Sequence, residues 1–158
     1  MNSGKLNFLG FPEHDIYNIT APFQWMGRVV IAGRVEKREE ELSRIIFFEK
    51  SENQWQPYPN GPSFKGLQDP CVTKIDGKIL LGGVRFPVQI GENDKAWQME
   101  FYLQRGEGSF EQVLSGPPKM KDIRFLQLPD DKILVLTRPQ GEKGGRGNIC
   151  YSLLDTCL

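Results

Sequence analysis

Gly77-Lys-Ile-Leu-Leu-Gly-Gly-Val-Arg85 is one of three similar runs in a chain of 158 residues. The other two are Gly27-Arg-Val-Val-Ile-Ala-Gly-Arg34 and Asp131-Lys-Ile-Leu-Val-Leu-Thr-Arg138. Each run begins with a turn residue and a basic residue, continues with an apolar segment, and ends in arginine. Short apolar runs bounded by turn formers are typical of β-strands. The three runs therefore predict three equivalent strands.

An aspartate begins a further β segment upstream of each run. These residues are Asp15, Asp69 and Asp122, and the intervals between them are 54 and 53 residues. Similar units repeated at such a period indicate the blades of a β-propeller, each a four-stranded antiparallel sheet. We therefore predict an all-β chain without long helices. It should be a partial five-bladed β-propeller with about three four-stranded antiparallel blades.

The length of the chain limits it to part of a ring. Closed propellers use roughly four to eight blades, whereas three units, at approximately 15–68, 69–121 and 122–158, fill this chain. The tail after residue 147 offers one more strand at most, and the charged run 36–41 is interpreted as a solvated hairpin tip. Residues 1–158 are thus predicted to form a single incomplete propeller domain. Its open blade edges favour self-association, so we expect a homo-oligomer.

The charge balance argues against several classes of partner. Twenty Lys and Arg residues balance twenty Asp and Glu residues, so no bulk positive field attracts nucleic acid. No apolar run approaches the roughly 20 residues of a membrane span, and we expect a cytoplasmic protein without a membrane partner. The three Cys residues form no C-x-x-C pair, and His14 is the only histidine. We therefore expect neither a metal site nor a cofactor.

Four stretches of the chain resemble a known family. They are Asp15-Ile-Tyr-Asn-Ile-Thr-Ala-Pro-Phe23, Gln68-Asp-Pro-Cys-Val-Thr-Lys-Ile-Asp-Gly-Lys78, Lys121-Asp-Ile-Arg124 and Thr137-Arg-Pro-Gln-Gly-Glu-Lys-Gly-Gly-Arg-Gly147. Over nearly all of residues 6–147, the chain resembles an uncharacterised bacterial family of five-bladed propellers, domain of unknown function family 1861. It is more distantly similar to the β-fructosidase, arabinanase and mannoside-phosphorylase propellers. In those enzymes the blades also open with Asp or Asp-Pro at the central pocket, which implies a carbohydrate site there.

Asp15, Asp69 and Asp122 are the candidate catalytic residues. The innermost strands of a propeller converge on its axis, so we expect these side chains to ring the mouth of the central pocket. Cleavage of a glycoside needs two carboxyl groups, one that donates a proton and one that acts as base or nucleophile. The alternative is structural, with each aspartate accepting hydrogen bonds from the backbone of a turn.

Arginines recur beside these acids. Arg85, Arg124 and Arg138 lie at or near strand ends, and Arg146 lies in a glycine-rich loop. Guanidinium groups bind phosphate or carboxylate through paired hydrogen bonds, so these arginines are candidate ligand-binding residues for a phosphorylated or acidic sugar. Arg124 is favoured because it lies two residues from Asp122, on the same face of a strand. Alternatively, the arginines form internal ion pairs with the aspartates.

Tyr17 and Asn18 complete the candidate ligand-binding residues, because a tyrosine ring can stack on the face of a sugar. The first functional interpretation is a carbohydrate-active propeller, glycosidase-like or glycoside-phosphorylase-like. Such a protein acts on or binds a small glycoside or a sugar phosphate at its central pocket. The alternatives are non-catalytic binding of a sugar or acidic metabolite, and a scaffold fragment that offers its blade edges to a partner. The sequence does not decide between hydrolysis, phosphorolysis and binding alone.

Overall fold

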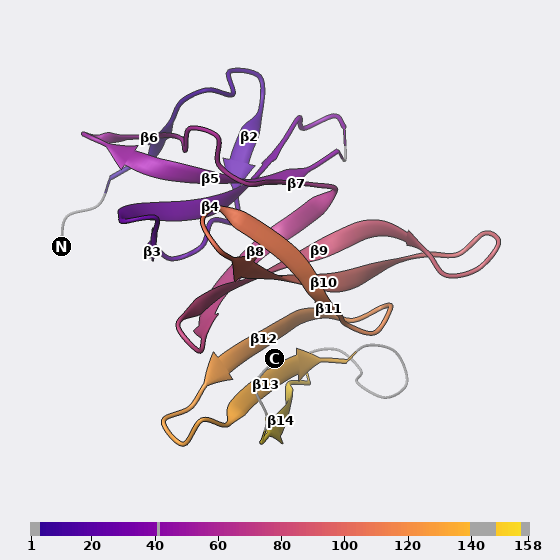
Figure 1. Cartoon of the computed structure of the whole chain (residues 1–158). Coiled ribbons are helices and arrows are strands. Elements are labelled where there is room, and N and C mark those ends of the chain that lie inside the picture. Colours follow the sequence, from indigo (N-terminus) through magenta and orange to yellow (C-terminus); the bar gives the residue numbers. More distant parts are fainter. Residues whose placement is uncertain (1–3, 41, 140–147, 156–158) are drawn as a thin grey trace. The chain divides into compact units, whose positions relative to one another are not determined.

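The computed structural model describes residues 4–40, 42–139 and 148–155 of the 158-residue chain. All regular elements among these residues are β-strands, which confirms the all-β prediction. The strands form three sheets that follow one another along the chain (Figure 1). Within the described ranges, no helix has the length and apolar character needed to cross a membrane.

The first sheet is built around two long antiparallel strands, β4 and β5, whose β-branched and aromatic residues suit a pleated, half-buried surface. Its order is β1-β6-β5-β4-β2, with β3 also paired to β4 and β7 to β5. The pair β1–β6 is parallel, and the other pairs are antiparallel. The strands are β1 (Asn7–Phe8), β2 (Asp15–Tyr17), β3 (Phe23–Trp25), β4 (Arg28–Glu36), β5 (Arg44–Ser51), β6 (Gln54–Pro57) and β7 (Ser63–Lys65).

The second sheet has the order β11-β10-β9-β8. Its strands are β8 (Leu67–Ile75), β9 (Lys78–Gln89), β10 (Lys95–Arg105) and β11 (Ser109–Ser115). The turn Asp76-Gly77 joins β8 to β9 with φ angles of 50° and 73°, and Met26-Gly27 joins β3 to β4 with 49° and 75°. Two-residue turns with both φ angles positive match the twist of a hairpin. The shared turn form supports the equivalence of these two hairpins.

The third sheet contains three antiparallel strands in the described residues. They are β12 (Lys121–Gln127), β13 (Ile133–Arg138) and β14 (Cys150–Leu154). β14 is the additional strand that the tail was predicted to hold. The register of β12 on β13 shifts between Lys121 and Arg124, so a β-bulge surrounds Asp122. Bulges redirect side chains and are common beside functional sites.

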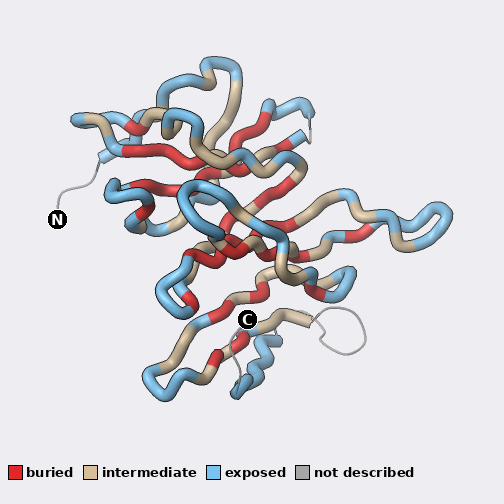
Figure 2. Tube along the Cα trace, in the orientation of Figure 1, coloured by how far each residue is buried: buried red, intermediate tan, exposed pale blue. Residues whose placement is uncertain are grey.

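The chain folds into two compact units, Met1–Pro70 and Cys71–Leu158. One core cluster of the first unit consists of Ile31, Val35, Phe48 and Trp55. In the second, one core draws on both sheets: Ile75, Leu80, Val84, Met99, Phe101, Leu103, Ile123, Phe125, Ile133 and Val135. Figure 2 colours the buried stretches of the chain red.

The shared core explains why three sheets make two units. The rings of Phe101 and Phe125 meet edge to face, with centroids 4.8 Å apart, and so join the second sheet to the third. Gly82 makes room for this contact, because a Cβ there would lie 2.6 Å from both the Phe101 ring and the sulfur of Cys71. The sheets draw on residues 7–65, 67–115 and 121–154. Their assembly into a single incomplete propeller stays a prediction.

Candidate functional site

Among the Asn and Asp residues that have a left-handed backbone, three lie at matching places, one in each repeat. They are Asn18 (φ 46°), Asp69 (φ 49°) and Asp122 (φ 62°). Asn and Asp enter this region more readily than other side chains, and such positions cluster at functional sites. An arginine follows each of them by 16 residues: Arg34, Arg85 and Arg138. The repeat therefore combines one short polar residue and one arginine.

Strand register supports this equivalence. The residue before Asn18 lies opposite Arg34, and the residue before Asp122 lies opposite Arg138. Asn18 thus occupies in the first sheet the position that Asp122 occupies in the third. Asp15, which the sequence interval suggested as the counterpart, lies three residues earlier, at the start of β2.

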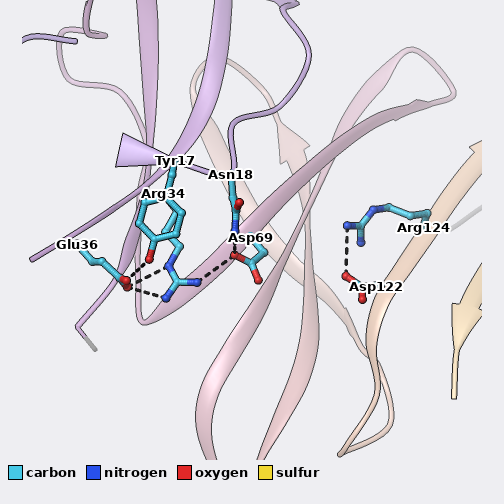
Figure 3. Close-up of polar contacts among 7 residues, drawn as sticks. All are labelled: Tyr17, Asn18, Arg34, Glu36, Asp69, Asp122 and Arg124. Atoms are coloured by element: carbon cyan, nitrogen blue, oxygen red, sulfur yellow. Dashed lines mark hydrogen bonds and ion pairs between the residues drawn. The ribbon is translucent and has the colours of Figure 1, made fainter. Parts of the chain in front are cut away.

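The first cluster consists of Asp69, Asn18, Arg34, Glu36 and Tyr17 (Figure 3). Oδ1 of Asp69, on β8, accepts hydrogen bonds from Nδ2 of Asn18 at 2.6 Å and from Nη1 of Arg34 at 3.0 Å. Oδ2 has no partner among the described residues, and the Asp69 side chain is 30% exposed. The carboxylate is therefore oriented through one oxygen and open to a ligand through the other.

Glu36 and Tyr17 hold the other side of Arg34. Nε and Nη2 of Arg34 donate to Oε2 of Glu36 at 3.0 and 2.7 Å, and the Tyr17 hydroxyl donates to Oε1. The guanidinium also lies 5.0 Å from the centre of the Tyr17 ring. Burial alone would raise the pKa of Glu36, but the hydrogen bonds from Tyr17 and Arg34 lower that pKa overall. Burial and the bond to Glu36 raise the pKa of Tyr17 to about 12, so the phenol stays protonated.

The second cluster consists of Arg85 on β9 with Glu100 and Tyr102 on β10. Nε and Nη2 of Arg85 donate to the two carboxylate oxygens of Glu100 at 3.0 and 2.7 Å. The Tyr102 hydroxyl donates to Oε2 of Glu100 at 2.6 Å. Burial raises the pKa of Glu100, but the bonds from Arg85 and Tyr102 lower it overall. Burial and the bond to Glu100 raise the pKa of Tyr102 to about 12.

The third cluster consists of Asp122, Arg124 and Arg138. Nη2 of Arg138 lies 2.6 Å from Oδ2 of Asp122, and its Nε is buried without a hydrogen-bond partner in the described chain. Nη2 of Arg124 lies 3.7 Å from Oδ1 of Asp122, and Nη1 donates to the backbone carbonyl of Ile123 at 2.9 Å. Figure 3 shows the Asp122–Arg124 pair. Asp122 is thus shared by the two arginines.

The first and third clusters differ in charge. In the first, one guanidinium faces the carboxylates of Glu36 and Asp69. In the third, one carboxylate faces the guanidiniums of Arg124 and Arg138. The first cluster is therefore suited to accept hydrogen bonds from hydroxyl groups, and the third to receive an anionic group.

Two of the candidate residues lie elsewhere. Asp15 is partly exposed and pairs with Arg38 at 2.8 Å, outside the first cluster. Arg146 lies outside the described residues. The internal ion pairs that the sequence suggested as an alternative role are present at Asp69 and at Asp122.

The sequence did not identify Glu36, Glu100 or Tyr102 as candidate site residues. Glu36 was assigned to a solvated hairpin tip, but it is the last residue of β4 and only 9% exposed. Its position two residues after Arg34 is the signal that could have found it, since alternate residues of a strand share a face. The link from Glu100 and Tyr102 to Arg85 depends on which strands are neighbours, and no local pattern carries that information.

The described residues hold no group of three or more His, Cys, Asp or Glu side chains that could bind a metal ion. In the second unit, a cavity of about 20 Å³ is lined by Cys71, Gly82, Phe101 and Arg124, among others. This space is enough for about one water molecule and is too small for a sugar. Burial raises the pKa of the Cys71 thiol, which favours its protonated form.

Comparison with known proteins places this chain in a family. The pattern of a family described as proteins of unknown function, DUF1861, matches residues 1–157. The chain belongs to this family. The family predicted from the sequence is thereby confirmed, while the bacterial origin and the five blades stay predictions. No curated protein matches the DUF1861 chain.

Three solved structures are similar to this DUF1861 chain. MPT-4, a mannose phosphorylase from Leishmania mexicana in complex with phosphate, is 32% identical with a TM-score of 0.82. MPT-1, a GDP-Man-dependent mannosyltransferase from the same organism, is 31% identical with a TM-score of 0.80. A hypothetical protein from Leishmania major is 32% identical with a TM-score of 0.79. Each match covers 96% of this chain but 46%, 46% and 48% of those proteins, so the chain spans about half their length.

Proposed function

We propose that this chain takes part in glycosyl transfer to or from phosphate on a small sugar, with Asp69 handling the proton of the reacting hydroxyl. The observation that carries the proposal is the one-sided hydrogen bonding of Asp69. Asn18 and Arg34 fix Oδ1, while Oδ2 is open among the described residues. A general base needs such an oriented, unoccupied oxygen within hydrogen-bond reach of its substrate.

The proposed transfer needs no reactant besides the sugar 1-phosphate and the acceptor. In the synthetic direction, an acceptor hydroxyl attacks the anomeric carbon of a sugar 1-phosphate, and the bond from that carbon to the phosphate oxygen breaks. The hydroxyl proton passes to Oδ2 of Asp69. In phosphorolysis, phosphate attacks and protonated Asp69 returns the proton to the leaving oxygen. Arg34 pairs with Asp69 at 3.0 Å and so holds the carboxylate in place for both directions of the reaction.

The first cluster favours phosphorolysis over hydrolysis. Hydrolysis by a pair of carboxyl groups needs a second available carboxylate. Glu36 is the other acid of the cluster, and both of its oxygens are engaged by Arg34 and Tyr17. Phosphate is already an anion and needs no second base. Similarity to MPT-4, a mannose phosphorylase that is 32% identical, supports the same choice.

The second candidate function is non-catalytic binding of a sugar or sugar phosphate. It is favoured by the extent of the match, which covers 46% of MPT-4. More than half of that protein lies outside the matched region. Under this alternative, the first cluster binds sugar hydroxyls without turnover.

The experiment measures phosphate release from mannose, glucose and galactose 1-phosphates in the presence of monosaccharide acceptors. Asp69→Asn should lower the rate by about a hundredfold or more, because the amide cannot exchange the proton. Asp15→Asn is the matched control and should stay within about twofold, since its ion pair is partly exposed.

Equal rates for the two variants would contradict the assignment of Asp69. Calorimetric binding of a sugar by the unaltered chain, lost in Asp69→Asn and without turnover, would establish the binding function instead. If the unaltered chain shows no binding and no turnover, both proposed functions are contradicted.

A further inference from the structure

We propose that Arg138 and Arg124 form a binding site for a phosphate group, with Arg138 as the principal ligand. The proposal rests on the proposed function, in which a phosphate group is a reactant. It adds a binding site for this group in the third cluster, which lies within the second unit. The ligand class is inorganic phosphate or the phosphate of a sugar phosphate, which share the same chemistry.

The repeat itself supplies the first step. Nε of Arg34 donates to Glu36, and Nε of Arg85 donates to Glu100. Nε of Arg138 is buried and has no partner within the described ranges. A buried donor without an acceptor is costly, and each one calls for an explanation. A bound anion at this position would supply the acceptor that a glutamate supplies in the other two clusters.

The local charge is the second step. Asp122 is the only carboxylate paired with Arg124 and Arg138 among the described residues. Lys121 adds a further cation, because it lies opposite Arg138 in the strand register. Its Nζ lies 5.3 Å from the centre of the Trp97 ring. Two guanidinium groups therefore share one carboxylate, and an anionic ligand would restore the balance.

The geometry is the third step. Asp122 engages Nη2 of Arg138, and Nε has no partner in the described chain. Nη2 of Arg124 lies beyond hydrogen-bond distance of Asp122, at 3.7 Å. The two arginine side chains are 34% and 41% exposed, so a ligand can reach them. Two guanidinium forks suit the several oxygens of a phosphate group better than the single oxygen of a sugar hydroxyl.

Isothermal titration calorimetry with inorganic phosphate and with mannose 1-phosphate, at constant ionic strength, tests the site. Arg138→Gln should weaken binding of both ligands by at least about tenfold, through loss of charge and fork. Arg138→Lys should weaken it by roughly threefold to tenfold, because lysine keeps the charge but not the fork. Arg124→Gln should also weaken it.

Arg105→Gln is the matched control in the same unit. Its side chain is 47% exposed and pairs with Glu111, so phosphate binding should stay within about twofold of the unaltered chain. Thermal melts show whether each variant is folded. If Arg138→Gln fails to fold, Arg138→Lys and Arg124→Gln decide the question.

Phosphate binding that is equal in Arg138→Gln and Arg105→Gln would overturn the site, as would no binding of either ligand. Weakening of both titrations supports a site for the shared phosphate group. Weakening seen with only one ligand supports the site and identifies that ligand as its source. Arg138-dependent phosphate binding without any transfer would leave the site standing and contradict the proposed enzyme. Transfer that depends on Asp69, with binding insensitive to Arg138, would overturn the site alone.

Discussion

In the first sheet, Arg34 lies between the carboxylates of Glu36 and Asp69, whereas in the third sheet Arg138 shares Asp122 with Arg124. Both arginines follow a left-handed Asn or Asp by 16 residues. The repeated backbone therefore delivers an arginine to the same position in these two sheets. The residues around that position decide whether the arginine is neutralised internally or is available to a ligand.

The second cluster shows that neutralisation does not depend on one strand. Glu36 follows Arg34 on the same strand, while Glu100 reaches Arg85 from the neighbouring strand β10. In both clusters the glutamate also accepts a tyrosine hydroxyl. The same arrangement of arginine, glutamate and tyrosine is therefore formed with the glutamate on the arginine's own strand or on the neighbouring strand. In the described part of the third sheet, Arg138 has no such glutamate.

Removing the charge of Glu36 should have the largest effect on stability. Glu36→Gln removes the carboxylate from the ion pair with Arg34. The side chains of this pair are only 11% exposed for Glu36 and 13% exposed for Arg34. The free energy of unfolding in urea should fall by about 3 kcal/mol. Glu40→Gln is the control, because its pair with Lys37 is exposed and should be worth less than about 0.5 kcal/mol. A loss below about 1 kcal/mol for Glu36→Gln would contradict this account of the first cluster.

Removing either clamping hydroxyl should have the next largest effect. Tyr17→Phe and Tyr102→Phe each delete a hydrogen bond to a glutamate. Because the acceptor is charged, each change should lower the free energy of unfolding by about 1.5 kcal/mol. Tyr151→Phe, at a side chain that is 72% exposed, should change nothing measurable in the same denaturant titration. Equal behaviour of all three variants would contradict the clamping role of the Tyr17 and Tyr102 hydroxyls.

Acid should weaken the first two clusters by a smaller amount. The pKa values of Glu36 and Glu100 are lowered from 4.5, so the unfolded chain takes up protons before the folded chain does. Their contribution to stability is complete above the unfolded pKa and is lost as pH falls through the folded pKa. We expect the free energy of unfolding to fall between about pH 5 and about pH 3, less steeply in Glu36→Gln. The same slope in both proteins would exclude Glu36 as a source.

Asp122→Asn should have the smallest effect on stability. Its partners Arg138 and Arg124 are 34% and 41% exposed, and Asp122 itself is 36% exposed. Solvent screens such pairs, so thermal melts should indicate a loss of less than about 1 kcal/mol. A loss as large as that of Glu36→Gln would show that the ion pairs of the third cluster stabilise the fold as much as those of the first.

The sequence predicted the strands well, because apolar runs and the turns that bound them are local signals. Asp76-Gly77 marks a hairpin by its own chemistry, and its left-handed φ angles agree. The repeat was found, but in the first sheet it was aligned on Asp15. Asn18 fills the left-handed position as well as an aspartate does, and the 16-residue spacing to Arg34 is what distinguishes the two.

The charge partners were harder to predict. Glu36 lies at the start of a charged run, and the hydrogen bonds from Arg34 and Tyr17 favour its burial. The pairing of Arg85 with Glu100 depends on β9 and β10 being neighbours. Such partners are set by the sheet, so they become visible only with the tertiary structure.

Heteronuclear NMR of the arginine Nε–H groups during titration with inorganic phosphate tests the central claim most directly. Arg138→Lys assigns one signal, because it removes the Nε–H group of that residue. The Nε–H signal of Arg138 should shift and saturate, since phosphate supplies its missing acceptor. The signals of Arg34 and Arg85 should stay in place, because Glu36 and Glu100 already hold those groups. A shift of Arg34 or Arg85 without Arg138, or no shift of any of the three, would contradict the account.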